Sequence, residues 1–342
     1  MDIDKKTTQE FATKPKEGGV WGVIIIGSGP ASFAASIYTT RGAASTLILG
    51  GEKWGGQLML TTTVDNYPGL PGIQGPDLME KMKSHATMFG GEFVAKSVSG
   101  IDVSKKPFEL TATSGEKYLG KSVIVATGAE TMWLGIPGED KLRGKGVSSC
   151  APCDAPFFKN KNVAVIGGGD SAMEEALVLT KYATSVTMIH RKDEFRASKV
   201  MQQKIFDLEK SGKVKIIWNS EVKEFIGETK LEKVKLFNNK TNQETEMIFD
   251  GAFVAIGHKP STEIFSNKLE LDERGFVVRK DGTKTSVEGI FVAGDVHDHT
   301  YKQAVTAAGF GVMAAMDTLR FLDETEASKN EVDKEGQLRK NG

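Results

Sequence analysis

Residues 20–32 read Val20-Trp-Gly-Val-Ile-Ile-Ile-Gly-Ser-Gly-Pro-Ala-Ser32, an apolar run that ends in a glycine-rich turn. The run has the length and composition of a strand buried in a parallel sheet. A helix is expected over residues 31–40 and a second strand over residues 46–49, which completes a β-α-β unit. Gly27 permits the tight turn, and Gly29 lets the backbone and the helix N-terminus approach a pyrophosphate. This stretch therefore predicts a dinucleotide-binding domain.

Two positions next to this turn add detail to the prediction. Ser32 stands where such loops usually have Gly or Ala, and because serine is small it still allows the helix to pack closely on the strand. Glu52 follows the second strand, where an acidic side chain can bind a ribose hydroxyl of the nucleotide. Glu52 is therefore a candidate ribose ligand, and the alternative is a solvated loop carboxylate.

The same arrangement occurs a second time in the middle of the chain. An apolar strand over residues 162–166 leads into Gly167-Gly-Gly-Asp-Ser-Ala172, then into a helix and a strand over residues 185–189. Two glycine motifs in this context are stronger evidence than one. The basic cluster His190-Arg-Lys192 follows, with Arg196 further on. Cations at this position suit a 2′-phosphate, so the second site is predicted to prefer NADP over NAD; the alternative is a basic surface turn.

The two cysteines of the chain stand together as Cys150-Ala-Pro-Cys153, followed directly by Asp154. In the reducing cytosol, a CxxC pair is more often catalytic or metal-binding than a structural staple. A tetrahedral zinc site needs at least three protein ligands, and the five histidines are scattered away from the pair, so a metal site is disfavoured. A redox-capable dithiol between two dinucleotide motifs suggests an electron relay.

Further segments extend the α/β pattern. Residues 123–128 and 252–257 are similar apolar strands that end in glycine, and each is a place where the chain can pass between domains. Residues 289–295 form another buried strand that ends at Asp295, and a small-residue helix starts within residues 302–311. Small residues there permit close approach of a flat ring system, and Asp295 can accept a hydrogen bond from a ribityl hydroxyl; the alternative is a buried capping aspartate.

The bulk properties limit the partners. The length of 342 residues suggests two domains, and 39% hydrophobic with 26% charged residues is typical of a soluble globular protein. A net charge of −1 favours neither nucleic acid nor an anionic membrane as a partner. Residues 1–19 are polar and lack the apolar segment of a secretory signal, so we expect a cytoplasmic protein.

Together these residues are similar to the low-molecular-weight thioredoxin reductases, flavoproteins that use FAD and NADPH. The matching motifs occur in the family's order over nearly the whole chain, and in combination they are highly specific. They are Gly27-Ser-Gly-Pro-Ala31, Gly55-Gly-Gln-Leu58, Asp65-Asn-Tyr-Pro-Gly69, Ala126-Thr-Gly-Ala129, Cys150-Ala-Pro-Cys-Asp154, Gly167-Gly-Gly-Asp-Ser-Ala172, His190-Arg-Lys-Asp-Glu-Phe-Arg196, Ala255-Ile-Gly-His-Lys-Pro260 and Ala293-Gly-Asp-Val-His-Asp298.

The resemblance implies an α/β fold with two Rossmann-like domains. The FAD-binding domain would be discontinuous, over residues 1–129 and 257–342, with flexible tails at residues 1–19 and 324–342. The NADPH-binding domain, residues 130–256, would be inserted into it and would carry the redox-active pair. A homodimer is a further expectation from the family.

The resemblance also implies the site residues. FAD contacts are expected from Gly27, Gly29, Pro30, Ala31, Gly51, Glu52, Gly56, Gln57, Asn66, Thr127, Gly128, Gly294, Asp295, Gln303, Ala304 and Val305. NADPH contacts are expected from Gly167, Gly169, Asp170, Ser171, His190, Arg191, Lys192, Arg196, Ile256 and Gly257. The catalytic residues would be Cys150, Cys153 and Asp154, with no metal.

The implied reaction is thioredoxin-disulfide reduction, in which electrons pass from NADPH to FAD, to the Cys150–Cys153 disulfide and to oxidised thioredoxin. Asp154 would act as acid/base, with Cys153 facing the flavin. Because the dithiol and the NADPH loop share one domain, that domain is expected to rotate between steps. Near the dithiol, the candidates for docking the partner are Phe157, Phe158 and Lys145; the alternative for either Phe is core packing.

Besides Ser32, three residues depart from the family pattern. Lys192 replaces a frequent Arg and loses its bidentate fork, which weakens 2′-phosphate binding without abolishing it. Ala155 replaces a usual Gly, which is costly only if that position needs a positive φ. Pro152, inside the CxxC, fixes φ and removes an amide N–H, and so bears on the dithiol's potential or its partner.

Other functions of the same fold are disfavoured. A flavin-dependent dithiol oxidase is the closest rival, but an oxidase has no need of the Gly167 loop with Arg191 and Arg196. The same argument disfavours a relative reduced by ferredoxin. A peroxide-linked reductase of this fold would carry an additional thioredoxin-like N-terminal domain. A redox sensor would require the dithiol to be oxidised and reduced without a partner protein.

Overall fold

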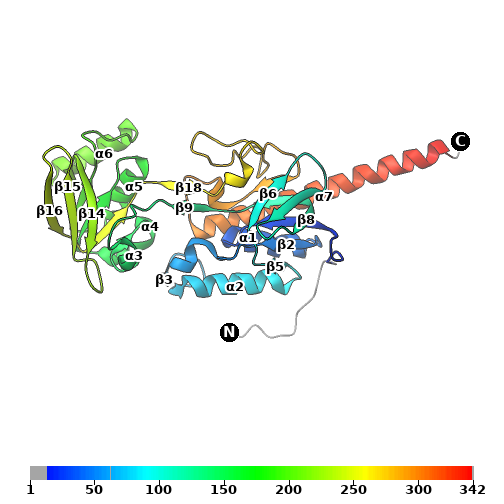
Figure 1. The fold of residues 1–342 in the computed structure, drawn as a ribbon, viewed down its shortest axis with the longest axis horizontal. Helices are drawn as coiled ribbons and strands as arrows, with labels where there is room; N and C mark the ends of the chain where they lie inside the picture. Colours follow the sequence, from blue (N-terminus) through cyan, green and yellow to red (C-terminus); the bar gives the residue numbers. More distant parts are fainter. Residues whose placement is uncertain (1–13, 62, 341–342) are drawn as a thin grey trace. The chain divides into compact units, whose positions relative to one another are not determined.

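The computed structural model describes residues 14–61 and 63–340, with side chains up to residue 328 and at residue 330. The chain divides into two compact units (Figure 1). Unit 1 comprises Met1–Glu130 and Lys259–Gly342, and unit 2 comprises Thr131–His258. The chain leaves unit 1 at β9 (Ala129–Thr131) and returns at β18 (His258–Pro260), and these two strands pair with each other.

Unit 1 is built on a mixed sheet whose central strands are parallel. Its strand order is β5-β2-β1-β8-β7-β6, and β19 also pairs with β8. Strands β5, β2, β1, β8 and β19 are parallel to their neighbours, whereas β8, β7 and β6 form an antiparallel meander. The bounds are β1 Val20–Ile26, β2 Thr46–Leu49, β5 Glu92–Val94, β6 Val98–Asp102, β7 Phe108–Ala112, β8 Lys117–Val125 and β19 Ile290–Val292.

Helices and short elements complete unit 1. The predicted helix after the first glycine turn is α1 (Pro30–Arg41), and α2 (Gly75–Met88) and α7 (Ala304–Lys340) accompany it. Gly42 and Gly311 let α1 and α7 approach closely, because a Cβ at Gly311 would lie 2.1 Å from the Ala31 carbonyl oxygen. The short elements are η1 Gly56–Leu60, β3 Thr63–Val64, β4 Ile73–Gln74, η3 Glu263–Phe265 and η4 Gly294–Val296.

Helix α7 differs from the expectation for the C-terminus. It continues through residues 324–340, which were predicted from their polarity to form a flexible tail. The polar residues Glu, Lys, Gln and Arg of this range are good helix formers, so polarity alone did not decide against a helix. The predicted N-terminal tail lies mostly in residues 1–13, outside the described residues, and β1 begins at Val20.

The first part of α7 is also apolar. Ala304–Ser328 is long and apolar enough to cross a membrane, with a mean hydropathy of 1.2. The same segment contributes Ala307, Ala314 and Ala315 to a core that contains residues of α1 and β1. This packing is that of a core helix in a folded domain. Such a helix can be as long and as apolar as a helix that crosses a membrane.

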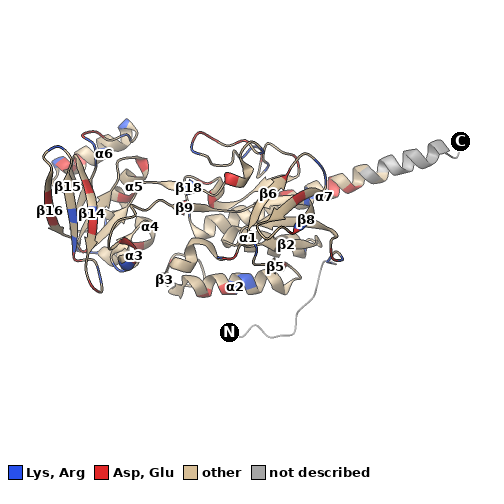
Figure 2. Cartoon of the chain, viewed as in Figure 1, with Lys and Arg blue, Asp and Glu red and all other residues tan. Residues whose placement is uncertain are grey.

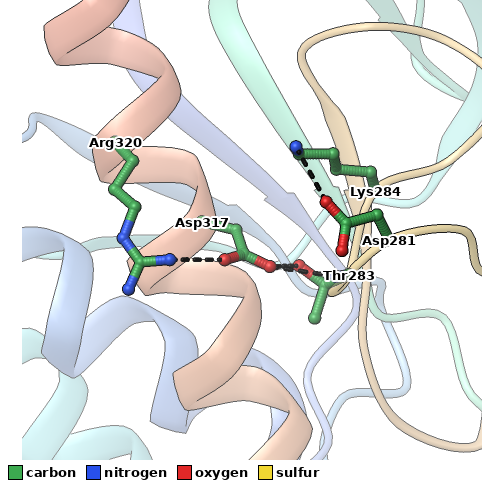
Figure 3. Close-up of polar contacts among 5 residues, drawn as sticks. All are labelled: Asp281, Thr283, Lys284, Asp317 and Arg320. Atoms are coloured by element: carbon green, nitrogen blue, oxygen red, sulfur yellow. Dashed lines mark hydrogen bonds and ion pairs between the residues drawn. The ribbon is translucent and has the colours of Figure 1, made fainter.

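A polar clamp on α7 holds the segment that precedes β19 (Figure 3). The Asp317 carboxylate accepts hydrogen bonds from the backbone N–H and the hydroxyl of Thr283, at 2.9 and 2.7 Å. Arg320 lies 3.4 Å from its other oxygen. The Thr283 carbonyl in turn accepts the N–H of Val292, at 2.9 Å. Asp317 therefore helps to set the position of β19, which leads directly into η4 and Asp295.

Unit 2 has its own parallel sheet, in the order β10-β17-β11-β12-β13. Unit 2 has two apolar cores. Val163 and Val165 belong to one core, and Ala164 and Ile166 belong to the other, because successive side chains along β11 point to opposite faces of the sheet. The bounds are α3 Glu139–Leu142, β10 Val147–Ser148, α4 Ala151–Asp154, η2 Ala155–Phe158, β11 Asn162–Ile166, α5 Asp170–Leu179, β12 Ser185–Ile189, α6 Lys199–Lys210, β13 Val214–Ile217 and β17 Gly251–Val254.

An antiparallel sheet follows in unit 2, formed by β14 (Ser220–Ile226), β15 (Lys233–Asn238) and β16 (Gln243–Ile248). Its exposed residues carry alternating charges (Figure 2). Lys233 pairs with Glu246 at 2.9 Å and Lys235 with Glu244 at 2.8 Å. Such exposed pairs add little stability, but charges on the edge strand β16 oppose unwanted strand pairing.

Candidate active site and nucleotide-binding loops

The two cysteines form a disulfide at the start of α4. Their Cα atoms lie 5.3 Å apart, and Cys150 is the residue that precedes the first turn of the helix. Pro152 lies in that first turn, where an amide N–H has no partner within the helix. Proline inside this CxxC therefore costs no helical hydrogen bond.

Ser148 connects the first cysteine with Asp154. The backbone N–H of Cys150 donates to Ser148 Oγ at 3.1 Å, and the Ser148 hydroxyl donates to Asp154 Oδ2. Burial raises the pKa of the Asp154 carboxyl, and the bond from Ser148 opposes this shift. A carboxyl with a raised pKa beside the disulfide is suited to proton transfer. Ser148 was missed from the sequence, where the only signal was a hydroxyl two positions before Cys150.

The second glycine loop is closely packed in unit 2. Gly167 has a φ of +155°, and a Cβ there would lie 2.3 Å from the Ala255 carbonyl oxygen. Gly169 precedes α5, whose first-turn residues include Asp170 and Ser171. Asp170 Oδ1 accepts the N–H of Ser198 at 2.9 Å, which ties the loop after β12 to this helix.

The basic cluster lies partly beside this loop. The Arg196 N–H donates to the Gly168 carbonyl at 2.9 Å, and its Nε lies 3.6 Å from the position of a Cβ on Gly169. Arg191 and Lys192 are exposed, as is Arg196. Arg196 is therefore accessible to a phosphate next to the loop, and Arg191 and Lys192 are exposed to solvent. The predicted NADPH contacts Ile256 and Gly257 follow β17, and Gly257 has a φ of +121°.

His190 differs from the rest of the basic cluster. It is 9% exposed, and its ring packs on Phe195 and Trp218. Burial and the cations of Arg191, Arg196 and Lys192 lower its pKa, which favours a neutral imidazole. Its Nε2 has no hydrogen-bond partner among the described residues. The His190 ring therefore packs directly against Gly168, where an added Cβ would lie 2.2 Å from the ring.

The first glycine loop has matching features in unit 1. Gly27 has a φ of +120°, and a Cβ there would lie 2.2 Å from the Ala126 carbonyl oxygen. Gly29 precedes α1, and Pro30 occupies its first position. A Cβ on Gly29 would meet no described atom within 4 Å, so the face above this helix end is open. Ser32 is fully buried next to Gly27, which agrees with close helix–strand packing.

Asp295 is the most perturbed carboxyl of unit 1. Burial, and then the Asp298 carboxylate, raise its pKa to about 7. Its Oδ1 is buried and has no hydrogen-bond partner among the described residues. Asp298 instead accepts the N–H groups of Thr300, Tyr301 and Lys302 and so shapes the loop before α7. An unsatisfied buried oxygen at Asp295 fits a ligand hydroxyl, such as one of a ribityl chain.

Glu52 is engaged by the protein itself. Its carboxylate accepts the Ser97 N–H at 3.3 Å, the Ser97 hydroxyl, and the Thr113 hydroxyl at 3.2 Å. Hydrogen bonds, chiefly the one from the Ser97 hydroxyl, lower the pKa of the Glu52 carboxyl to about 2. The carboxylate is therefore a fixed anion at the end of β2, held by two residues that sequence reasoning did not find.

The other residues of unit 1 that were predicted to contact FAD lie in turns, in the first turns of helices or in side-chain hydrogen bonds. Asn66 Nδ2 donates to Gln303 Oε1 at 3.1 Å, which joins two distant segments. Gln57 Nε2 donates to the Ala129 carbonyl at 2.6 Å, and Thr127 Oγ1 to the Ser261 carbonyl at 2.7 Å. Positive φ values occur at Gly51, Gly56, Gly128 and Gly294, and Ala31, Ala304 and Val305 lie in the first turns of α1 and α7.

Comparison with known proteins decides the family. A family model described as "Pyridine nucleotide-disulphide oxidoreductase" matches residues 21–311. "Thioredoxin reductase" of Rickettsia conorii is 47% identical over 307 residues, which are 88% of this chain and 98% of the relative. That of Streptomyces coelicolor is 47% identical over 319 residues, 91% of this chain and 98% of the relative.

This chain belongs to the thioredoxin reductases of the pyridine nucleotide-disulphide oxidoreductase family.

Solved structures agree with the sequence comparison. "Thioredoxin reductase from Giardia duodenalis" has a TM-score of 0.85 and 40% identity, covering 89% of this chain and 99% of the other. The enzyme from Streptococcus pyogenes has a TM-score of 0.84 and 38% identity, with the same coverage. The α/β class with two Rossmann-like domains, predicted from the sequence, is thereby confirmed. Membership of this family implies flavin and nicotinamide cofactors.

The departures from the family pattern have structural explanations. Ala155 has a φ of −52° and a ψ of −36°, a right-handed conformation that needs no glycine. Lys192 is exposed and next to Arg191, where a long cation keeps its charge available.

Of the docking candidates, Phe157 is 52% exposed, and Lys145 is exposed as well. Phe158 belongs to the core, with its ring 5.2 Å from that of Phe253, so its predicted docking role is wrong.

The open face at Gly29 leads to a test of the first nucleotide site. Gly29→Ala places a methyl group in open space at a φ of −80°, so the flavin-free protein should keep its melting temperature. If a pyrophosphate occupies this space, the affinity for FAD should fall at least tenfold, measured by flavin fluorescence titration. Gly27→Ala is the contrasting control, because its Cβ would overlap Ala126 and should lower the melting temperature. Unchanged FAD affinity in Gly29→Ala would place the phosphates elsewhere.

Proposed function

We propose that this protein is a thioredoxin-disulfide reductase that uses FAD and NADPH, with thioredoxin or a thioredoxin-like protein as its partner. The observation that carries the proposal is the Cys150–Cys153 disulfide, with Ser148 and Asp154 bonded beside it. It lies in unit 2, together with the basic second glycine loop. Nearly half of the residues are shared with the Rickettsia conorii and Streptomyces coelicolor enzymes over most of the chain.

The residues of each unit fit one cofactor. In unit 1, the open helix end at Gly29 suits the FAD pyrophosphate, and the unsatisfied Asp295 oxygen suits a ribityl hydroxyl. In unit 2, the Gly167–Gly169 loop suits the pyrophosphate of NADPH, with Arg191, Lys192 and Arg196 for its 2′-phosphate. The chemistry that the two cofactors supply when bound is hydride transfer followed by two-electron reduction of a disulfide.

The dithiol then reduces the partner by thiolate exchange. The Cys150 thiolate attacks one sulfur of the oxidised thioredoxin, and the second thioredoxin sulfur leaves as a thiolate that takes a proton from Asp154. Cys153 gives its proton to the Asp154 carboxylate and attacks Cys150 in the mixed disulfide, which restores the Cys150–Cys153 bond and releases the other thioredoxin sulfur, which takes up that proton. Two electrons pass to thioredoxin in total. Phe157, as an exposed apolar anchor, and Lys145 are the proposed docking residues.

We further propose that the units move relative to each other during turnover. The redox pair and the nicotinamide loop both belong to unit 2, whereas the flavin residues belong to unit 1, so one flavin must serve both. The Lactococcus lactis thioredoxin reductase in its "FR conformation" has a TM-score of 0.60, although its identity of 40% and its coverage are the same as those of the Giardia enzyme. This spread supports units that take several placements. A cross-link between the units that left turnover unchanged would contradict the proposal.

A titration distinguishes the proposed function from the dithiol oxidase alternative. Under anaerobic conditions, NADPH should bleach the flavin absorbance of the purified protein, and oxidised thioredoxin should restore it. In Cys150→Ser, NADPH should still bleach the flavin, but thioredoxin should not restore the absorbance, because the relay is broken. A wild-type flavin that thioredoxin leaves bleached, while oxygen and a small dithiol support turnover, would favour the oxidase.

The basic cluster leads to a prediction of coenzyme preference. Arg196→Ala removes a charge-assisted bond to a 2′-phosphate, worth about 1.5–3 kcal/mol, so the KM for NADPH should rise about 10- to 100-fold. NADH lacks the 2′-phosphate, and its KM should stay the same. Lys204→Ala, an exposed cation on α6, is the matched control and should change neither value. An equal rise for both coenzymes in Arg196→Ala would contradict 2′-phosphate recognition.

The exposed face of α7 suits a second copy of the chain. Val305, Met313 and Met316 are 41–44% exposed and recur at helical spacing on one face, with Gly309 between them. A Cβ on Gly309 would meet nothing within 4 Å, which leaves room for a close neighbour. We propose that this face forms the homodimer contact of a cytoplasmic enzyme that needs no membrane.

The dimer contact can be tested by charge insertion. Met313→Glu with Met316→Glu buries two carboxylates in the proposed contact and should convert the protein from dimer to monomer in sedimentation velocity. Val200→Glu, at a 68% exposed apolar residue of α6, is the control and should leave the sedimentation coefficient unchanged. A double variant that sediments as the wild type would exclude this face.

A further inference from the structure

Glu175 reaches the redox loop from the nucleotide-binding helix. It lies on α5, six residues after Gly169, and its Oε2 accepts the backbone N–H of Ala151, the residue that follows Cys150. Ala151 is fully buried and belongs to a core cluster with Ala172 and Ala176 of α5. Close packing of α4 on α5 through alanines therefore holds this carboxylate against the cysteine loop.

The contact places a negative charge next to Cys150. Standard bond lengths put the Glu175 carboxylate within roughly 7 Å of the Cys150 sulfur, since it bonds the adjacent amide. Amide N–H groups in the first turn of a helix would otherwise stabilise a thiolate there. At this loop the Ala151 amide donates to Glu175, and the Cys150 amide donates to Ser148. The amides of Cys150 and Ala151 are thus both directed to other acceptors.

Two carboxyl groups with different roles bond the segment around the pair. Asp154 accepts from Ser148, and burial raises its pKa, so that it can carry a proton. Glu175 accepts from a backbone amide, an arrangement that favours an ionised carboxylate. The neighbouring Glu174 on the same helix is exposed and provides a comparison at almost the same place in the sequence.

We propose that Glu175 is a positioning residue that keeps the Cys150–Cys153 pair strongly reducing, because it disfavours the Cys150 thiolate. This inference rests on the proposed function only in that the pair alternates between disulfide and dithiol. Reduction of the disulfide takes up two electrons and two protons to form two thiols, or one proton if Cys150 stays a thiolate. A feature that stabilises the reduced form makes a pair more oxidising. A carboxylate that destabilises the thiolate has the opposite effect and favours electron transfer onward to a partner.

The test separates the charge from the hydrogen bond. Glu175→Gln keeps an oxygen acceptor for Ala151 and removes the charge, and Glu175→Ala removes both. After equilibration in glutathione buffers at a pH above the Cys150 thiol pKa, where the reduced pair carries the thiolate, the dithiol fraction is read by alkylation and mass spectrometry. We expect an equilibrium shift of about tenfold towards the dithiol in Glu175→Gln, about 30 mV for a two-electron couple, and a larger shift in Glu175→Ala. Glu174→Gln should stay within about twofold of the wild type.

A second readout excludes a merely structural role. In a Cys153→Ser background, the pH dependence of alkylation reports the Cys150 thiol pKa, which should fall by about one unit with Glu175→Gln. A lower melting temperature without a change in thiol pKa or glutathione equilibrium would overturn the proposal, and so would equal shifts in Glu174→Gln and Glu175→Gln. If the wild-type pair equilibrates with glutathione but NADPH does not reduce it, the proposed function fails instead, independently of Glu175.

Discussion

The close approach of a strand, a glycine turn and a helix is the constraint on which both units depend. At Gly27 a Cβ would lie 2.2 Å from the Ala126 carbonyl, and at Gly167 it would lie 2.3 Å from the Ala255 carbonyl. Each of these alanines follows the neighbouring parallel strand, just before the chain leaves its unit. One steric requirement therefore joins each glycine loop to the point where the chain crosses into the other unit. A side chain at either glycine would disturb the loop and the crossing together.

The two loops share this scaffold but differ in charge. In unit 1 the surroundings are acidic, with Asp295 carrying a raised pKa and Glu52 held as an anion by Ser97 and Thr113. In unit 2 the exposed cations Arg191, Lys192 and Arg196 follow β12, with Arg196 beside the glycine loop, and the ring of His190, whose pKa is lowered by burial, packs against Gly168. Acceptors suit sugar hydroxyls and cations suit a phosphate, so the same backbone geometry is suited to two different nucleotides through the residues around it.

The sequence predicted what depends on local patterns. Buried strands, glycine turns and the CxxC pair are contiguous in the chain, and their spacing carries the structural information. The contacts of Ser148, Ser97 and Glu175 could not be predicted in this way, because each depends on packing between segments that are separate in sequence or on the direction of one side chain. Phe157 and Phe158 show the same limit, since the two adjacent rings point to solvent and to the core, and only the position of η2 on the sheet decides which.

Pro152 and Ala155 can stand in place of the family's usual residues because α4 makes few demands on these two positions. Pro152 lies where a helix leaves an amide unpaired, and Ala155 has an ordinary right-handed conformation, so neither departure from the family strains the loop. The groups that bond the amides of Cys150 and Ala151 are a hydroxyl before the motif and a carboxylate on the next helix. A substitution at Pro152 therefore leaves these contacts in place. The electrostatics of the first cysteine are accordingly controlled from outside the motif, by the helix that begins at the nucleotide loop.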